Sequence, residues 1–196
     1  FITIAWHTAP GDGICLKNFP LRIKNCHDVI IRFIRIRPGI EKLEQGMTND
    51  AIEVRNSGNV IIDHCTAGWS TDEIVNCWHG SSDLTVQWCI FSEPLNNSVH
   101  PKGKHGYAAS IGGKRATFHH NLFASAPGRN PGIAGDDKSR TEDLEFINNA
   151  LFNFGHRACD GKPVSINFIA NYYKPGPSTQ EALKNKIVRI DNSMIY

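Results

Sequence analysis

The sequence predicts an all-β protein, a right-handed single-stranded parallel β-helix in which short strands stack as the rungs of a solenoid. The first observation behind this prediction is a repeated eight-residue pattern rich in β-branched and aromatic residues, which favour strands. Its copies are residues 29–36, 60–67, 84–91, 116–123, 144–151 and 166–173. Because no helical pattern separates these copies, each is expected to form part of one β rung.

The sixth position of the pattern gives the second observation. It is occupied in turn by Cys65, Cys89, Asn121, Asn149 and Asn171, at intervals of 22 to 32 residues. Asparagines at the same place on successive rungs can form a ladder, in which each side-chain carbonyl accepts from the next amide at ~4.8 Å spacing. The two cysteines are predicted to be small buried side chains on the same stack. A β-sandwich is the alternative, but its hairpins recur about every 8–12 residues, which is a shorter spacing than this one.

Length and charge set the broad class of the protein. A chain of 196 residues is long enough for one substantial core, and we expect residues 1–196 to form a single β-helix domain. The net charge is only +2 and no basic run indicates nucleic acid. No apolar stretch approaches the roughly 20 residues of a membrane span. Residues 1–5 resemble a strand already in progress and lack an initiator methionine, so we interpret the chain as truncated at its N-terminus.

The cysteine pattern favours free thiols. The six cysteines contain no Cys-x-x-Cys pair, and two of them fall on the predicted inward stack. A disulfide framework is therefore disfavoured, and buried free thiols are predicted. A zinc site around Cys77 and His79 is disfavoured as well, because no second pair of ligands has zinc-like spacing.

The first half of the chain alternates short strands with turns. Strands are expected at residues 2–5, 14–17 and 21–24, with the Pro-Gly-Asp-Gly turn at 10–13 between the first two. Residues 29–37 are expected to form a pair of strands, followed by a polar loop at 40–49 that covers one face. The next strand begins at Asp50. This acid therefore lies at a junction between loop and strand, where functional side chains are common.

The second half carries most of the candidate chemistry. Two adjacent acids, Asp72 and Glu73, follow the strand at 60–67, and residues 92–115 form the longest excursion between core strands. The Pro-Gly and Asn-Pro steps around Arg129 predict a rigid turn that presents this side chain. Residues 136–143 are charged and are expected to form a solvated loop. A polar segment at 175–186 precedes a last strand at 187–190.

Seven short motifs in this order resemble the pectate lyases of polysaccharide lyase family 1, and the resemblance covers about residues 2–173. The markers are Thr8-Ala-Pro-Gly-Asp-Gly-Ile14, residues 29–38, Val60-Ile-Ile-Asp-His64, Trp69-Ser-Thr-Asp-Glu73, Thr85-Val-Gln-Trp-Cys89, Phe118-His-His-Asn-Leu-Phe123 and Arg129-Asn-Pro131. Each motif alone is weak, whereas their shared order is a strong match. The resemblance implies a right-handed parallel β-helix that cleaves de-esterified polygalacturonate by β-elimination with calcium.

The resemblance also assigns roles to particular residues. The family's catalytic arginine matches Arg129, and the place of a second arginine is taken by Ala134, so its role is lost or falls to Arg140. The calcium acids match Asp50 and Glu73. A further acid is expected at Cys77, and Asp72 is its predicted substitute. These roles remain implications of the resemblance.

The loop after the Trp-Cys strand is expected to bind substrate. The resemblance places a substrate-binding and catalytic lysine there, which best matches Lys102, with Lys104 as the second choice. His105 and Arg129 complete the predicted substrate-binding set. The Asp63-His64 pair also belongs to the family pattern; we interpret it as a satisfied buried pair rather than a general base, because the resemblance places it on the far side from the cleft.

These residue types suit β-elimination of a uronate. A divalent cation on the substrate carboxylate stabilises the enolate-like intermediate, and calcium prefers several hard oxygen ligands. Lys102 would neutralise a further carboxylate. Arg129 can act as a base only if neighbouring cations lower its pKa; the alternative role is a carboxylate clamp.

Two other function classes remain open from the sequence. One is a non-catalytic β-helix, either a carbohydrate-binding or adhesion module or an inactive lyase remnant. The other is a polygalacturonase-type hydrolase, which needs two carboxyl groups about 5–9.5 Å apart on either side of the bond. The expected partner is an acidic polysaccharide, with no nucleic acid or membrane. A plant-wall polymer as substrate implies a secreted protein, and we expect a monomer.

Overall fold

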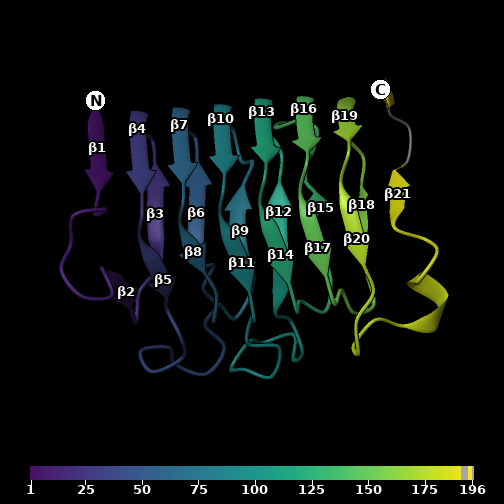
Figure 1. Ribbon diagram of the computed structural model, residues 1–196, viewed down its shortest axis with the longest axis horizontal. Helices are drawn as coiled ribbons and strands as arrows, with labels where there is room; N and C mark the ends of the chain where they lie inside the picture. The colour runs from purple at the N-terminus through teal and green to yellow at the C-terminus, as the bar shows by residue number, and fades with distance from the viewer. Residues whose placement is uncertain (191–193, 196) are drawn as a thin grey trace.

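The protein is a parallel β-helix built from three parallel sheets. The computed structural model describes residues 1–190 and the backbone of 194–195, and its successive coils lie side by side along one axis (Figure 1). Strands that are neighbours within a sheet come from successive coils, and every pair is parallel, as between β7 (Gly58–Asp63) and β10 (Ser82–Gln87). The predicted parallel β-helix is confirmed.

Each sheet takes one strand from most coils. The first sheet contains β1 (Ile2–Ala5), β4 (His27–Arg32), β7, β10, β13 (Lys114–His119), β16 (Glu142–Ile147), β19 (Ser165–Ile169) and β22 (Met194–Ile195). The second contains β2 (Cys15–Lys17), β5 (Arg35–Arg37), β8 (Thr66–Ala67), β11 (Ile90–Ser92), β14 (Leu122–Ala124), β17 (Ala150–Phe152) and β20 (Tyr172–Lys174). The third contains β3 (Leu21–Lys24), β6 (Ile52–Arg55), β9 (Glu73–Cys77), β12 (Tyr107–Ile111), β15 (Gly132–Ile133), β18 (Cys159–Gly161) and β21 (Val188–Ile190).

The repeated sequence pattern spans a strand of the first sheet, a tight corner and a strand of the second sheet. The fifth residue of every copy has a left-handed backbone, with φ between 52° and 56°. These corner residues are Phe33, His64, Trp88, His120, Asn148 and Ala170. Such a conformation is unfavourable for a residue with a side chain. Interactions of the neighbouring residues inside the coil therefore have to offset the cost of each corner.

The predicted ladder supplies those interactions and is confirmed. The side-chain amide of Asn121 donates to Asn149 Oδ1 at 3.0 Å, and that of Asn149 donates to Asn171 Oδ1 at 3.0 Å. The same oxygens accept from the backbone N–H groups of the preceding rung, each at 3.0 Å. Cys89 continues the stack, because its N–H donates to Asn121 Oδ1 and its sulfur accepts the Cys65 N–H at 3.4 Å.

We expect Asn149→Ala to lower the free energy of unfolding by about 1–3 kcal/mol, because it removes the acceptor of the buried Asn121 N–H and one partner each of the Asn121 side-chain amide and the Phe118 carbonyl. Asn167→Ala is the matched control. Asn167 lies on the same coil as Asn171 but opposite Glu145 on the outer face of the first sheet. Urea titrations of both variants check the expectation, and equal losses of stability in the two would contradict it.

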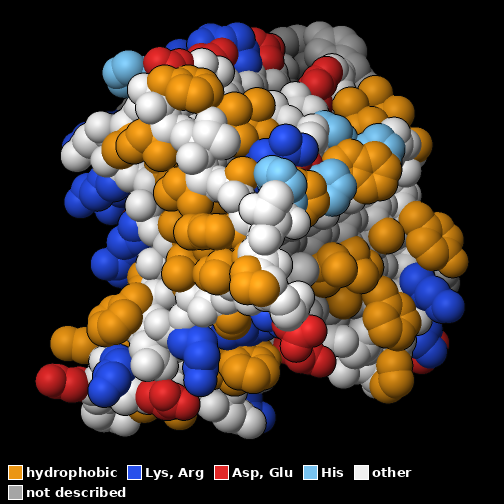
Figure 2. Space-filling view, turned by 60° about the vertical axis from the view of Figure 1, so that its left-hand side comes forward, with side chains coloured by type: hydrophobic (Ala, Val, Ile, Leu, Met, Phe, Trp, Pro, Cys, Tyr) orange, Lys and Arg blue, Asp and Glu red, His pale blue; other side chains and the backbone are white. Residues whose placement is uncertain are grey.

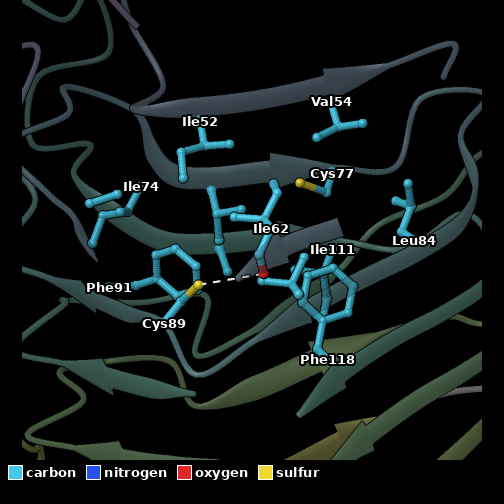
Figure 3. Close-up of a cluster of buried hydrophobic side chains, with 14 of the residues drawn as sticks. Ile52, Val54, Ile62, Ile74, Cys77, Leu84, Cys89, Phe91, Ile111 and Phe118 are labelled. Atoms are coloured by element: carbon cyan, nitrogen blue, oxygen red, sulfur yellow. Dashed lines mark hydrogen bonds between the residues drawn. The ribbon is translucent and has the colours of Figure 1, made fainter. Parts of the chain in front are cut away.

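The core inside the coil is a set of apolar stacks. One row in register consists of Ile31, Ile62, Val86, Phe118 and Phe146, and all five are at most 1% exposed. Side chains of all three sheets point into this interior (Figure 3), where Phe91 from the second sheet and Ile111 from the third are fully buried. The alternation of inward and outward residues along each strand therefore fixes which side chains remain available for function.

Some local expectations need correction. All six cysteines are free, but Cys15 and Cys26 are exposed rather than buried. The expected final strand is present as β21, and it follows a 3₁₀ helix, Glu181–Leu183, which the polar composition of 175–186 did not indicate. Among the described residues, no helix has the length and apolar character that a membrane crossing requires.

Candidate functional site

The acids at the beginning of two neighbouring rungs are held together by a buried network. The side-chain oxygen of Asn49 accepts from the Thr71 N–H and from the Thr71 hydroxyl, and the Thr71 oxygen accepts from the Asn49 N–H at 2.9 Å. Asp72 N–H donates to the Asn49 carbonyl at 3.0 Å. Because both network residues are buried, this arrangement fixes Asp50 and Asp72 where β6 and β9 begin.

Asp50 is tied to the next rung by both of its oxygens. Its Oδ1 accepts from the Glu73 N–H and its Oδ2 accepts from the Asn76 amide, each at 3.0 Å. Burial, together with the negative charge of Asp72, raises the pKa of Asp50 to about 7, and the Asn76 hydrogen bond only partly opposes this. Asp50 is therefore an acid that a nearby cation would convert to its charged form.

Three carboxylates converge at this point, as the sequence predicted. Oxygens of Asp50, Asp72 and Glu73 all lie within 4.8 Å of one another. The further acid that the resemblance implies at position 77 is not part of this cluster. Cys77 stands there, and its side chain is fully buried in the core (Figure 3). The preceding residue, Asn76, lies beside Asp50 instead.

Asn76 is a residue that sequence reasoning missed. Its Oδ1 is buried and has no hydrogen-bond partner. The alternation of β9 could have identified it: Val75 and Cys77 pair with the inward Ile52 and Val54, so Asn76 must lie on the outer face opposite Glu53.

Arg129 reaches the acid cluster from the turn that the sequence predicted. Its guanidinium forms an ion pair with Glu73 and lies over the Tyr107 ring, 4.6 Å from the centroid. A Cβ at Gly132 would lie 3.1 Å from Arg129 Cγ, so glycine there leaves room for this side chain. Burial lowers the pKa of Arg129, although Asp72 opposes the effect.

A second positive side chain lies near Arg129, but it is not Arg140. Arg129 and Arg157 line one hollow of about 340 Å³ on the third sheet, together with Ala134. Arg157 is held by a two-point contact with Asp160 at 2.7 and 2.8 Å. Arg140 lines two other hollows, beside Asp137. The structure thus brings Arg157 to the side of Arg129, where the sequence offered only Ala134 and Arg140.

The loop that carries the predicted substrate-binding residues lies over the acids. His105 Nε2 is 3.4 Å from Asp72 Oδ1, and its ring meets the Tyr107 ring edge-on at 4.5 Å. Lys102 and Lys104 have exposed side chains on this loop, and the Lys102 N–H donates to His100 Nδ1 at 3.0 Å. His105 therefore contacts the cluster directly, whereas the two lysines face solvent.

The Asp63-His64 pair lies on a different sheet from the acid cluster. Burial alone would raise the pKa of Asp63, but hydrogen bonds from Gln87, His64 and Arg32 outweigh it and hold this pKa below its usual value. Asp63 is thus buried and satisfied, as interpreted, whereas His64 is exposed and stacks on Phe33 at 5.0 Å. Histidines gather beside hydrophobic side chains on the face drawn in Figure 2.

The residues of the acid cluster fit a calcium ion. Their free donors are oxygens only, which is the ligand type that calcium prefers. Two of these oxygens, Asp72 Oδ1 and Asn76 Oδ1, are buried without hydrogen-bond partners. Such buried oxygens, next to an acid whose pKa is raised, fit the ligand set of a divalent cation.

Comparisons with known proteins give relatives of this chain. "Probable pectate lyase C" of Aspergillus fumigatus is 33% identical over 184 residues, which is 91% of this chain. The same-named protein of Emericella nidulans is 32% identical over 182 residues, also 91% of this chain. "Pectate lyase 3" of Ambrosia artemisiifolia is 27% identical over 81 residues, 40% of this chain and 21% of its own. This chain spans about 40% of the length of the fungal relatives.

A solved structure and a family model complete the comparison. The crystal structure of alginate lyase from Paenibacillus sp. str. FPU-7 superimposes with a TM-score of 0.54 at 12% identity, covering 84% of this chain and 65% of that one. At this identity the likeness shows the β-helix fold alone. The family model described as "Pectate lyase" matches residues 11–136, which include the acid cluster and Arg129. The chain therefore belongs to the pectate lyase family.

Proposed function

We propose that this chain is the catalytic β-helix of a pectate lyase that cleaves de-esterified polygalacturonate by calcium-assisted β-elimination. The observation that carries the proposal is the contact of Arg129 with Glu73 inside a cluster of three acids. Family membership and the names of the fungal relatives support it. In this proposal Asp50, Asp72 and Glu73 hold the metal.

The proposed metal ligands would hold calcium beside the substrate carboxylate. When bound, calcium supplies positive charge that draws electron density from the uronate carboxylate and so makes the adjacent C5 proton more acidic. The carboxylates of Asp50 and Asp72, with Asn76 Oδ1, are positioned to hold it. Glu73 is buried and already engaged with Arg129, so its carboxylate has to be shared between the two.

Arg129 is the proposed base. In its neutral form, a guanidine nitrogen of Arg129 takes the C5 proton, the C5–H electron pair forms the C4–C5 double bond, and the C4–O bond breaks. The leaving oxygen keeps the electron pair of the broken C4–O bond and takes a proton from solvent. Burial already lowers the pKa of Arg129, whereas its ion pair with Glu73 favours the charged form. Arg129 can therefore serve as a base only after its ion pair with Glu73 has broken and the Glu73 carboxylate binds another cation.

The remaining site residues hold the polymer in register. The exposed side chains of Lys102 and Lys104 suit contacts with uronate carboxylates, and His105 lies where it can meet the sugar bound above Asp72. Lys102 is the one we also assign to the chemical step, as a charge that neutralises a carboxylate. A secreted monomer that acts on acidic polysaccharide is consistent with these assignments.

Incubation with polygalacturonate tests the proposal. Elimination leaves a conjugated double bond that absorbs ultraviolet light, so absorbance should rise with calcium and stop when a chelator is added. Reducing ends without ultraviolet absorbance would indicate a hydrolase. Binding without either product would indicate a non-catalytic carbohydrate-binding module.

Asn76→Asp should tighten calcium binding by at least about tenfold at pH 8, because it adds a charged oxygen to a site of hard ligands. Cys77→Asp places an acid at the position that the family resemblance implies, but it buries a charge in the core and should unfold the protein. Calcium titration calorimetry and circular dichroism measure the two effects. Unchanged calcium affinity in Asn76→Asp would show that Asn76 lies outside the metal site.

A further inference from the structure

Two buried histidines contact the carboxylate of Asp72. His100 Nε2 lies 3.6 Å from Asp72 Oδ2, and His105 Nε2 lies 3.4 Å from Asp72 Oδ1. The side chains of the two histidines are only 2% and 11% exposed, and their rings stack with centroids 4.1 Å apart. Two imidazoles and one carboxylate thus face one another with little access for solvent.

These separations are too long for hydrogen bonds, which span about 2.7–3.2 Å between nitrogen and oxygen. Asp72 Oδ1 in fact has no hydrogen-bond partner although it is buried. Two atoms that each lie about 2.0–2.1 Å from one tetrahedral metal ion are separated by about 3.3–3.4 Å. One donor atom from each of the three residues also lies within 4.8 Å of the other two. The 3.4 and 3.6 Å separations involve different oxygens of Asp72 and the two rings are stacked, so the three side chains can hold one metal ion only after a ring turns its Nε2 toward it.

We propose that Asp72, His100 and His105 form a second metal site that takes a divalent transition ion such as zinc. Two imidazole nitrogens and one carboxylate oxygen are ligands that zinc and its neighbours prefer, whereas calcium selects oxygen ligands. Water would complete the coordination from the solvent side of Asp72, which is 24% exposed. This site differs from the oxygen cluster of Asp50, Asp72 and Glu73 in its ligand chemistry and shares one residue with it.

Binding at this site is coupled to the substrate-binding loop. The Lys102 N–H donates to His100 Nδ1 at 3.0 Å, so neutral His100 carries its proton on Nε2. A metal ion at Nε2 requires that proton on Nδ1, and the Lys102 N–H must then find another acceptor. The peptide that precedes the Lys102 side chain therefore moves when the metal binds, and this movement weakens the affinity.

A second consequence rests on the proposed calcium site. Asp72 belongs to both clusters, so a transition ion held by the histidines leaves Asp50 and Glu73 as the acids for calcium. Occupancy of the histidine site should raise the calcium concentration needed for lyase activity by at least about tenfold, as for loss of one charged ligand.

Cobalt(II) titration tests the site without substrate. Cobalt replaces zinc in such sites, and its visible absorption intensifies in a tetrahedral environment. We expect one equivalent of cobalt to bind to the calcium-free protein, and His100→Gln, His105→Gln and Asp72→Asn each to weaken binding at least about tenfold. His119→Gln is the matched control. It removes the other close histidine pair, in which His119 Nδ1 and His120 Nδ1 lie 2.8 Å apart, and it should leave the titration unchanged.

Two outcomes would contradict the proposed metal site. One is absence of the cobalt band in the folded wild-type protein. The other is loss of the band in His119→Gln while His100→Gln, His105→Gln and Asp72→Asn retain it. Circular dichroism shows which variants are folded, and Asp72→Asn keeps both buried histidines in case their removal unfolds the chain. Asp50→Asn should weaken calcium binding but keep the cobalt band. Because no substrate is present, failure of this test is distinct from absence of lyase activity.

Discussion

Arg129→Lys should reduce the turnover rate on polygalacturonate by about 100- to 10,000-fold, the range expected for loss of a general base. Lysine keeps the positive charge, but it lacks the planar guanidinium that lies over Tyr107 and reaches Glu73. Binding of the polymer depends mainly on charge and should change by less than about threefold. Steady-state ultraviolet assays give the turnover rate, and calorimetry on the inactive variant gives the affinity.

Arg115→Lys is the control for this prediction. Arg115 lies on the first sheet, where it pairs with Asp83 at 2.7 Å, and its exchange should leave both the turnover rate and the affinity unchanged. If Arg129→Lys kept its turnover rate and only required more substrate, Arg129 would be a carboxylate clamp. The base would then have to be sought among the other groups around Tyr107.

The coil of the β-helix was predictable because its determinants are local and repeated. Each rung repeats one pattern, in which a corner residue precedes a buried ladder residue such as Asn121 or Asn149. Each side chain of such a strand faces either the interior of the coil or its outer surface. The local sequence pattern determines which, without reference to distant contacts. The convergence of Asp50 and Glu73 followed for the same reason, since both stand at equivalent places on successive rungs.

The parts of the site that were not predicted depend on whether a single residue faces inward or outward on its strand, or on the conformation of loops. Asn76 and Cys77 are neighbours, yet one lies outside and the other in the core, so a shift of one residue exchanges an oxygen ligand for a buried thiol. His100 lies in a loop without periodicity, and no local pattern shows that its ring would meet Asp72. Arg157 reaches the hollow of Arg129 only because the next coil stacks there.

Asp50→Asn should weaken calcium binding at pH 8 by at least about tenfold, because it removes one of three charges from the proposed site. The size of this loss should depend on pH. The pKa of Asp50 is raised to about 7, so in the wild-type protein a proton competes with calcium for this carboxylate below that pH. Wild-type affinity should thus fall about tenfold per pH unit below pH 7, and the difference between the two proteins should shrink toward pH 5.

Calorimetric calcium titrations at pH 5, 6, 7 and 8 measure both curves. Glu142→Gln is the matched control, because Glu142 lies on the first sheet and pairs with Lys114 at 3.3 Å, outside the acid cluster. Its calcium affinity should follow the wild-type curve at every pH. A constant ratio between wild type and Asp50→Asn across the pH range would mean that Asp50 does not exchange a proton for the metal. If that ratio were also close to one, calcium would be bound by Asp72 and Glu73 without Asp50.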